Sequence, residues 1–485
     1  MGYQMKEYDL IVIGSGSGMN YVSAMMDADP DMRVALVDKD EPGGICLTRG
    51  CIPSKMLLYP AELVRDINRA SNFGISASIE GIDFKMVMER MHTSISEDVE
   101  SIRHGYTHIP RLDFYNETAE FVSPYTMKVG EGFISSKMIF LCSGSKPAIP
   151  LVKGLKDIDF LTSDDVLELT ELPEKLVIIG GGYIAAEYGH FFSSMGSKVT
   201  IIGRNPRLIP EEEPEVSVLA KRMMLDYMDI LTNHEVVEIT SSSEGKTVIA
   251  KDRLTGETQR ITASSVLVAT GRSSNSDILK PEVGGIETDN RGWIRVNEHL
   301  ETSMKNVWAF GDANGKYLFK HVANHESTVV YYNAVLGKKA KADYHAVPYA
   351  VFSYPEIAGV GMTERKAVEE YGEENIVIGF YRFQDTAKGM AMSLGDDFVK
   401  LIIESNSQKI LGAHIIGPQA SVLIHQIIPL MYTEKQDATP IMYAMDIHPS
   451  LSEVIKRAFY SRMPVNEYHM IMQAYGLEDK EYSST

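Results

Sequence analysis

The chain has 485 residues, of which 44% are hydrophobic and 23% are charged, and its formal net charge at pH 7 is −19. This length favours more than one domain, and the acidic charge excludes a nucleic-acid partner, because nucleic-acid binding needs a basic surface. No apolar run approaches the roughly 18 residues of a membrane-spanning helix, so we expect no membrane partner. The first apolar strand begins near Tyr8 and leaves no room for a signal peptide, which favours a cytoplasmic protein.

Residues 8–38 follow a pattern of strand, glycine turn, helix and strand. The turn GSGSG has glycine at Gly14, Gly16 and Gly18, where the backbone can approach a pyrophosphate at a helix N-terminus. Met19 stands where the strict fingerprint has its last glycine, which predicts slightly looser packing of the helix on the strand.

Asp38 follows the second strand of this pattern. A carboxylate at this point can accept hydrogen bonds from the ribose hydroxyls of a bound nucleotide. The alternative is that Asp38 only begins a solvated turn.

Two of the three cysteines lie in the run GGICLTRGCIPSK, which covers residues 43–55. In a regular helix, the Cα atoms of Cys46 and Cys51 would be separated by a rise of about 7.5 Å. A disulfide tolerates at most roughly 7 Å, so a straight helix cannot bridge them, and Gly50 supplies the freedom for a distortion. A metal clip or two unrelated buried thiols are the alternatives, but no other close Cys or His pair accompanies them, so we expect no metal. Cys142 lies in an apolar run and is interpreted as a buried small residue.

A second pattern of strand, glycine turn, helix and strand covers residues 176–203. Its fingerprint reads Gly180-x-Gly182-x-x-Ala185. One such motif is weak evidence, but two in the same chain predict two nucleotide sites, one for each of two cofactors.

The loop after the second strand of this motif bears on the choice of coenzyme. A site for NADH needs an acid there to hold the ribose hydroxyls, but the chain has Gly203, followed by Arg204 and Arg207. Arginine binds phosphate through two parallel hydrogen bonds, so this loop favours NADPH, with its 2′-phosphate, over NADH. The alternative is that both arginines are ordinary loop charges.

The remaining patterns predict further strands and helices. Buried strands break at glycine near residues 141–147 and 266–272, where the chain can cross between domains or approach a ligand. We expect a helix over residues 320–336 and strands over residues 399–403 and 409–416, the strands belonging to an α+β domain.

The cysteine run resembles the active-site motif of the class I pyridine nucleotide-disulfide oxidoreductases, and the resemblance extends from the first strand to the last helix. It implies that electrons pass between a nicotinamide, a bound FAD and the dithiol. The family's first cysteine, here Cys46, exchanges with the substrate disulfide, and its second, here Cys51, lies against the flavin. Lys55 and Glu187 are similar to a lysine–glutamate pair near the flavin, although Lys55 alone would suit a solvated helix charge.

The same resemblance implies further cofactor contacts. Tyr183 is similar to the residue that covers the nicotinamide pocket, and Asp312 to the aspartate that hydrogen-bonds the flavin ribityl chain. The other expected contacts are Gly44, Ala119, Gly144 and Lys320 with FAD, and Gly271 with the nicotinamide coenzyme.

The run DIHPSLSE, at residues 446–453, resembles the family motif that carries the acid/base histidine. His448 corresponds to that histidine, and Glu453 to the glutamate that orients it. Ser450-x-x-Glu453 also has the spacing of a helix capping box, so Glu453 is expected to cap, to orient, or to do both. The family histidine reaches the dithiol of the other subunit, so the resemblance implies a homodimer.

We therefore expect an α/β fold with two Rossmann-like dinucleotide-binding domains, for FAD and NAD(P), and a C-terminal α+β dimerisation domain. The first part of the FAD-binding domain is expected at residues 1–150 and its second part at residues 276–345. The NAD(P)-binding domain is expected at residues 151–275, and the dimerisation domain at residues 346–485.

Within the family, several stretches look most like mycothione reductase, which favours NADPH-linked reduction of a small-molecule disulfide. The runs IAAE at residues 184–187 and KHVANHE at residues 320–326 carry this likeness. The alternative is a dihydrolipoamide dehydrogenase, which would use NAD(H) and dock to a 2-oxo acid dehydrogenase complex. Its own His-Pro motif resembles residues 448–453 equally well.

Overall fold

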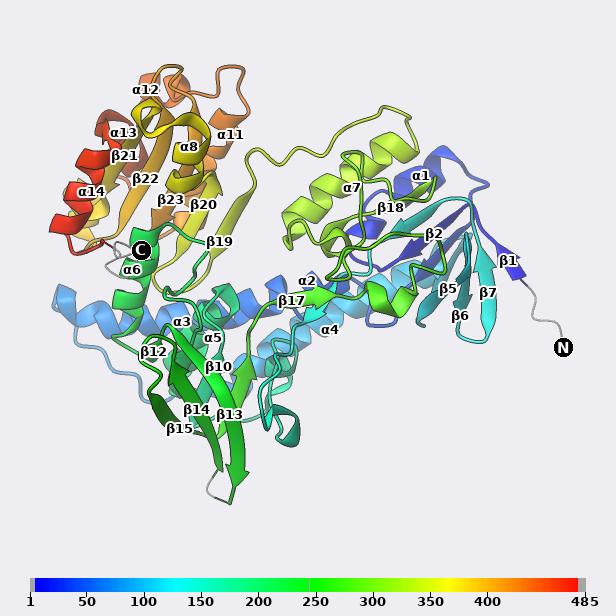
Figure 1. The fold of residues 1–485 in the computed structure, drawn as a ribbon, viewed down its shortest axis with the longest axis horizontal. Helices are drawn as coiled ribbons and strands as arrows, with labels where there is room; N and C mark the ends of the chain where they lie inside the picture. The colour runs from blue at the N-terminus through cyan, green and yellow to red at the C-terminus, as the bar shows by residue number, and fades with distance from the viewer. Residues whose placement is uncertain (1–4, 244, 479–485) are drawn as a thin grey trace.

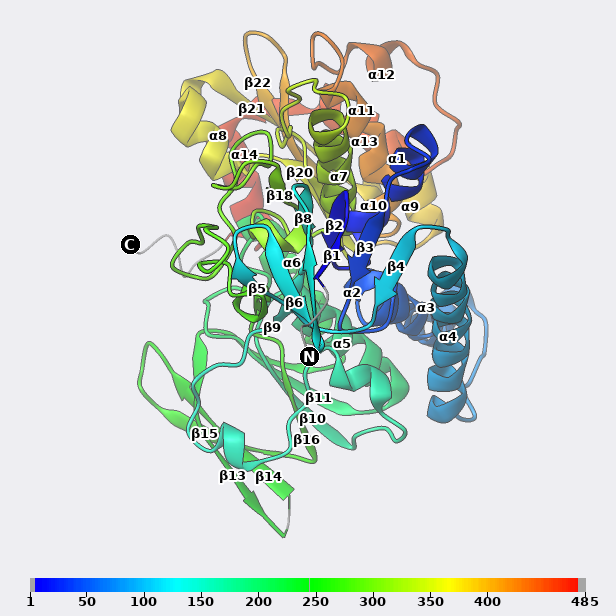
Figure 2. The same ribbon diagram turned by 90° about the vertical axis from the view of Figure 1, so that its right-hand side faces the viewer.

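The fold is described from a computed structural model, which covers residues 5–243 and 245–478. Figure 1 shows an N-terminal unit in blue and cyan on the right, a green unit below, and a C-terminal unit in yellow to red at the upper left. Figure 2, turned by 90°, again places the green unit at the bottom and the C-terminal unit at the top. Within the described residues, no helix has both the length and the apolar character needed to cross a membrane.

A five-stranded parallel sheet forms the centre of the N-terminal unit, in the order β18-β8-β2-β3-β4. Its inner strands are almost wholly buried, as expected where both faces of a parallel sheet are covered. The strands are β2 (Leu10–Ile13), β3 (Val34–Val37), β4 (Leu112–Tyr115), β8 (Ile139–Leu141) and β18 (Val307–Ala309).

The two faces of this sheet have different covers, and side chains alternate between them along each strand. Leu10 and Val12 face one core, which contains α1 (Val22–Ala28) and α7 (Lys320–Ala334). Ile11 and Ile13 face the other core, beneath a second sheet. That sheet consists of β1 (Met5–Glu7), β5 (Ala119–Ser123), β6 (Thr126–Val129) and β7 (Gly132–Ser135).

Two long helices lie between β3 and β4 along the chain and join the N-terminal unit to the green unit (Figure 1). The short helix α2 (Gly44–Thr48) leads into α3 (Cys51–Arg69), and α4 (Phe84–His108) follows. Apolar residues of α3 and α4 share one core with α5 (Tyr183–Met195). The dithiol segment is therefore held between the two predicted nucleotide sites.

The green unit contains a four-stranded parallel sheet in the order β12-β11-β10-β16. Helices α5 and α6 (Pro214–Met224) cover one face, and an antiparallel meander covers the other. The sheet strands are β10 (Lys175–Ile179), β11 (Lys198–Ile202), β12 (Asp229–Leu231) and β16 (Ser265–Val268). The meander consists of β13 (His234–Ser242), β14 (Gly245–Asp252) and β15 (Thr258–Ala263).

Two short strands, β9 (Ser145–Pro147) and β17 (Arg272–Ser274), pair antiparallel where the chain enters and leaves the green unit. They follow the two glycine breaks that the sequence predicts as crossing points. Figure 1 places β17 between the two units.

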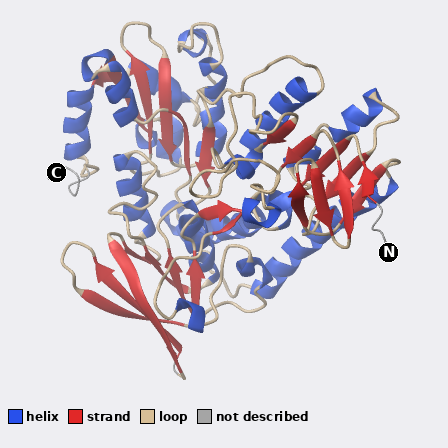
Figure 3. Ribbon diagram, turned by 45° about the vertical axis from the view of Figure 1, so that its right-hand side comes forward, coloured by secondary structure: helices blue, strands red, loops and turns tan. Residues whose placement is uncertain are grey.

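The C-terminal unit contains a six-stranded antiparallel sheet with helices packed on it (Figure 3). Its strands are β19 (Pro348–Val351), β20 (Ile357–Gly361), β21 (Ile376–Arg382), β22 (Phe398–Glu404), β23 (Ile410–Ile416) and β24 (Arg462–Pro464). Its helices are α8 (Glu364–Tyr371), α9 (Ala387–Ala391), α10 (Ala420–Leu423), α11 (Ile428–Met431), α12 (Thr439–Tyr443), α13 (Glu453–Tyr460) and α14 (Val465–Ala474).

A buried ion cluster fixes the green unit against the C-terminal unit. The Lys400 ammonium on β22 lies 2.6 Å from Glu213 and 2.5 Å from Glu215 of the green unit, and 2.7 Å from Glu364 on α8. The three carboxylates are close enough to hold a metal ion, but the Lys400 side chain takes that place. Removing one partner of such a buried cluster typically costs about 3–5 kcal/mol, so these contacts define how the two units sit together.

Candidate active site

The cysteine segment is interrupted where the sequence predicts a distortion. Helix α2 ends at Thr48 and α3 begins at Cys51, so Arg49 and Gly50 lie outside both helices. A Cβ on Gly50 would lie 2.8 Å from the carbonyl oxygen of Ile45, and only glycine fits there. Arg49 is anchored by ion pairs with Asp40 and Asp164.

Both cysteines are free thiols in this structure. A hydrogen bond from Cys46, together with the positive charge of Lys55, lowers the pKa of the Cys51 thiol to about 6. The same hydrogen bond, together with burial, raises the pKa of the Cys46 thiol. The hydrogen bond between the two thiols therefore favours the proton on Cys46 and the negative charge on Cys51.

The expected pair of Lys55 and Glu187 is present. The Lys55 ammonium, one turn after Cys51 on α3, lies 2.8 and 2.9 Å from the two carboxylate oxygens of Glu187 on α5. The Phe352 backbone N–H donates to the same carboxylate at 3.0 Å, and the Phe352 ring lies 4.9 Å from the ammonium. Phe352 belongs to the C-terminal unit, and no sequence signal pointed to it.

The first glycine turn, at residues 14–18, leaves space beside its backbone that side chains would occupy. Gly14 has φ +95°, and a Cβ there would collide with the backbone of Cys142. Gly44 at the start of α2 has φ +74°, and its Cβ would lie 2.6 Å from the Cα of Gly16. The dithiol helix thus begins directly on the turn where a pyrophosphate would bind, and the bare backbone of the turn fits the FAD that the sequence implies.

Gly18, the residue before Met19, packs closely on the first strand. A Cβ on Gly18 would lie 3.0 Å from both Cys142 Sγ and a methyl group of Val12, so the turn already packs closely on the strand at this position. This contact lies next to Met19, and the looser packing expected at Met19 itself stays a prediction. Cys142 is partly buried beneath the turn.

Asp38 lies at the end of β3, beside the turn. Its Oδ2 accepts hydrogen bonds from the Ser15 backbone N–H at 2.8 Å and from the Ser15 hydroxyl at 2.6 Å. Oδ1 accepts the backbone N–H of Asp40 at 3.1 Å. The carboxylate is thus held at the turn with acceptor capacity left for a ribose hydroxyl.

Asp312 is distant in sequence from the first nucleotide turn but contacts Ser145, which follows the expected FAD contact Gly144. Its carboxylate accepts a hydrogen bond from the Ser145 hydroxyl at 2.5 Å, and burial raises its pKa. Arg272 Nε donates to the same hydroxyl at 2.6 Å. A partly buried carboxylate beside the Ser145 hydroxyl suits the hydroxyl groups of a ribityl chain.

The side chain of Lys320 reaches the first nucleotide turn. Its ammonium donates to the Ser17 hydroxyl at 2.9 Å, inside the first nucleotide turn. The positive charge of Lys320 opposes the effects that raise the pKa of Cys46. Of the other expected FAD contacts, Ala119 is buried at the start of β5, and Gly144, with φ +68°, lies against Ile45 beside Cys46.

The second glycine turn has the same construction. Gly180 has φ +133°, and a Cβ there would collide with the carbonyl of Ala269. Gly182 is the N-cap of α5, Tyr183 is its first residue, and Ala185 is fully buried. Burial, together with the nearby carboxylates of Glu211 and Glu212, raises the pKa of the Tyr183 hydroxyl. Gly271, with φ +103°, leaves open space at its Cα.

In the loop after β11, close packing explains the glycine at position 203. The loop also contacts Arg253, which the sequence did not predict. A Cβ on Gly203 would lie 3.2 Å from the Cα of Gly181, so the approach of the glycine turn itself favours glycine here. Arg204 is exposed and Arg207 is partly buried. Arg253, from the end of β14, donates to the carbonyl of Arg204 at 2.9 Å.

His448 and Glu453 are paired as expected. His448 Nδ1 lies 3.0 and 3.2 Å from the two carboxylate oxygens of Glu453, and this contact lowers the pKa of the carboxyl. Glu453 also accepts the Ser450 backbone N–H at 3.1 Å. The Ser450 hydroxyl instead contacts the Ser452 hydroxyl, and Ser452 is the N-cap of α13. Glu453 therefore orients His448 and holds the turn before α13, but the predicted capping box does not form, because Ser452 rather than Ser450 is the N-cap.

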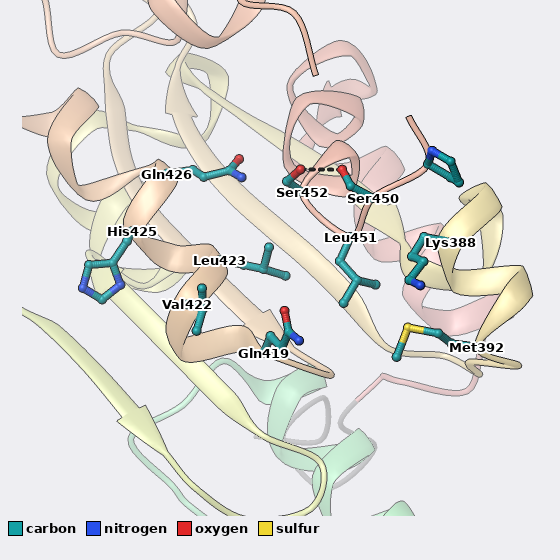
Figure 4. A pocket seen from close by; sticks show the side chains of 11 residues that line it. Lys388, Met392, Gln419, Val422, Leu423, His425, Gln426, Ser450, Leu451 and Ser452 are labelled. Atoms are coloured by element: carbon teal, nitrogen blue, oxygen red, sulfur yellow. Dashed lines mark hydrogen bonds between the residues drawn. The ribbon is translucent and has the colours of Figure 1, made fainter. Parts of the chain in front are cut away.

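A pocket of about 720 Å³ is lined in part by the residues that follow His448 in the chain (Figure 4). It is lined by residues 449–452, by Lys388 and Met392 near α9, and by residues around α10 such as Gln419 and His425. The His448 side chain itself is 66% exposed. Figure 1 places α13, which follows His448, well apart from α2, which carries Cys46.

The comparisons with known proteins cover nearly the whole chain. A family model described as pyridine nucleotide-disulphide oxidoreductase matches residues 8–328, and one described as its dimerisation domain matches residues 347–459. Mycothione reductase of Mycobacterium tuberculosis is 35% identical over 466 residues, which span 94% of this chain and 99% of that protein. Dihydrolipoyl dehydrogenase of Chlamydia muridarum is 34% identical over 463 residues, which span 92% of this chain and 95% of that protein.

Among solved structures, the HOCl-induced flavoprotein disulfide reductase RclA from Escherichia coli is similar, with a TM-score of 0.81 and 26% identity. The likeness covers 92% of this chain and 98% of that one. Together, these matches confirm the predicted fold class, with a part that binds FAD and a nicotinamide coenzyme followed by a C-terminal dimerisation domain.

Proposed function

The chain belongs to the class I pyridine nucleotide-disulfide oxidoreductase family, and from this premise we propose that it is an NADPH-linked reductase of a small-molecule disulfide. The observation that carries the proposal is the free dithiol of Cys46 and Cys51 beside Lys55, in which the hydrogen bond between the thiols lowers the pKa of Cys51 and raises that of Cys46. When bound, FAD supplies the two-electron link between the nicotinamide and this dithiol.

In the proposed reaction, Cys46 must first lose its proton, because the thiolate is the nucleophile. It then attacks one sulfur of the substrate disulfide, which forms a mixed disulfide and releases one substrate thiolate. Cys51 attacks the Cys46 sulfur next, which forms the Cys46–Cys51 disulfide and releases the second thiolate. The two electrons of the dithiol end on the two substrate sulfurs. One leaving thiolate takes up the proton that Cys46 lost, and the other takes up a proton from solvent.

We assign the proton transfers to His448, held by Glu453. A base is needed because the hydrogen bond to Cys51 raises the pKa of Cys46. Since α13 lies far from α2 within one chain (Figure 1), the histidine that serves Cys46 belongs to the other subunit of a homodimer. The match to a dimerisation domain supports this arrangement. The exposed apolar residues Met445 and Ile447 beside His448 suit a surface that a second subunit covers.

We propose the domain boundaries given by the sequence, at residues 150, 275 and 345, and a cytoplasmic location. The crossing strands β9 and β17 lie next to the first two boundaries, which supports them. Arg204 and Arg207 support the choice of NADPH over NADH.

Dihydrolipoamide dehydrogenase is a second candidate, because relatives with that name match as much of the chain at nearly the same identity. Such an enzyme would use NAD(H) and serve a 2-oxo acid dehydrogenase complex. The deciding experiment assays lipoamide, oxidised glutathione, coenzyme A disulfide and mycothiol disulfide, each with NADPH and NADH. A preference for NADPH with a disulfide other than lipoamide supports the reductase. Efficient lipoamide turnover with NAD(H) alone would replace it with the second candidate.

A further inference from the structure

The backbone after β11 is joined to the start of the meander. In a doubly wound sheet, the adenosine end of a dinucleotide binds at the carboxyl ends of the strands, and β11 ends at Ile202. The His234 backbone N–H donates to the carbonyl of Gly203 at 3.0 Å, and Asn233 N–H donates to that of Asn205 at 2.7 Å. The first residues of the meander therefore lie against the loop that carries Arg204.

The register of the meander brings Arg253 to the same place. β13 and β14 pair antiparallel with His234 opposite Asp252, so Arg253 follows the strand end that lies nearest the loop. The Arg253 backbone N–H donates to Asn233 at 2.9 Å, and its guanidinium Nη1 donates to the carbonyl of Arg204 at 2.9 Å. Both the main chain and the side chain of Arg253 are thus fixed beside Arg204.

Arg204 and Arg253 form no ion pair with another residue in the part of the chain that the structure describes. The carboxylate next to them, Asp252, accepts the backbone N–H groups of Leu254 and Thr255 at 2.7 and 3.1 Å and so closes the hairpin turn. Neither Arg204 nor Arg253 forms an ion pair with a described carboxylate, although the chain has a net charge of −19. Two exposed arginines at one edge, Arg204 and Arg253, create a local positive field that suits a dianionic ligand.

We infer that Arg253 is a third arginine of the site for the coenzyme 2′-phosphate, and that it helps to set the preference for NADPH. A guanidinium has five N–H donors, and the bond to the Arg204 carbonyl uses one of them, which leaves donors for phosphate oxygens. This inference rests on the proposed use of NADPH. In this role the Arg253 side chain contacts the phosphate directly. In a purely structural role it would only hold the shape of the loop.

The test compares two ligands that differ only in the 2′-phosphate. Adenosine 2′,5′-bisphosphate and 5′-AMP are titrated into the FAD-loaded protein by calorimetry. Arg253→Gln removes one charge-assisted contact, so it should weaken binding of the bisphosphate roughly tenfold or more. Its affinity for 5′-AMP should change less than about twofold. Arg253→Lys should retain part of the affinity for the bisphosphate. The matched control is Arg260→Gln, an exposed arginine on β15 of the same meander, which should change neither ligand.

The outcomes separate the inference from the function on which it rests. Equal weakening of both ligands by Arg253→Gln would show that Arg253 only shapes the loop, and unchanged binding would show that it does not touch the phosphate. Either result overturns the inference while leaving NADPH in place, provided that the wild-type protein prefers the bisphosphate. A wild-type protein that binds both ligands equally would overturn the use of NADPH and the inference together.

Discussion

The ammonium of Lys55 lies 2.8 Å from the carboxylate of Glu187 and acts on Cys51 with the opposite sign to its partner. The positive charge of Lys55 lowers the pKa of the Cys51 thiol, and the negative charge of Glu187 raises it. Because the two residues lie on different helices, α3 and α5, this pair also couples the dithiol segment to the second nucleotide unit.

The first prediction uses these opposite signs. Lys55→Met should raise the pKa of Cys51 above its value of about 6, so its thiolate would appear only at higher pH. Glu187→Gln should move the same pKa downward. The measurement is the pH dependence of the long-wavelength thiolate–flavin absorbance in the half-reduced protein. Shifts of the same sign in both variants would contradict the assignment of charges.

The second prediction separates the roles of the two cysteines. Cys51→Ser should keep FAD but lose the thiolate–flavin absorbance, because the negative charge resides on Cys51. Cys46→Ser should keep an absorbing thiolate and lose disulfide reduction, because the attacking sulfur is gone. If the Cys51→Ser protein retained the absorbance, the roles assigned to the two cysteines would have to be exchanged.

The third prediction concerns Lys320, whose charge opposes the effects that raise the pKa of Cys46. Lys320→Met should raise that pKa further, so that less thiolate is present at a given pH and alkylation of Cys46 by iodoacetamide is slower. Lys316→Met is the control, since Lys316 lies over the ring of Tyr344. Equal alkylation profiles in Lys320→Met and the wild type would remove Lys320 from the dithiol site.

Local sequence determines most of what was predicted at this site. The glycine turns at Gly14 and Gly180, and the break at Gly50, depend on backbone approaches that a short motif specifies. Two contacts could not be predicted, because they depend on pairing between distant segments. Arg253 reaches Arg204 only through the register of β13 and β14, and Phe352 reaches Glu187 only through the packing of the C-terminal unit.

Gly203 shows a different limit of sequence interpretation. The missing carboxylate at this position was interpreted as a sign of NADPH. However, the close approach of Gly181 also favours glycine there, whatever the coenzyme. The arginines alone therefore carry the argument for the 2′-phosphate.

The fourth prediction tests those arginines by kinetics. A charge-assisted contact is typically worth roughly 1.5–3 kcal/mol, so replacing Arg204 and Arg207 with glutamine should raise the KM for NADPH by at least tenfold. The KM for NADH should change little, because NADH lacks the phosphate. A wild-type preference for NADH, or equal effects on both coenzymes, would bring dihydrolipoamide dehydrogenase forward as the function.

The fifth prediction is that His448 of one subunit serves Cys46 of the other. General acid–base catalysis is typically worth a factor of about 100 to 10,000, so His448→Ala should be nearly inactive with the disulfide substrate. Reduction of the flavin by the nicotinamide should survive in this variant, since that step does not use the histidine. Rapid-mixing measurements of the two half-reactions separate these effects.

A mixed dimer tests whether the two residues come from different chains. If the site is shared, a dimer of one Cys46→Ser chain and one His448→Ala chain has one site with both defects and one site with neither. Such a dimer should recover about half of the wild-type activity, although each parent homodimer is inactive. If each site is built within one chain, every site keeps one defect and the mixed dimer stays inactive. An inactive mixed dimer with normal FAD content, or a fully active monomer, would therefore show that His448 and Cys46 do not act across a subunit interface.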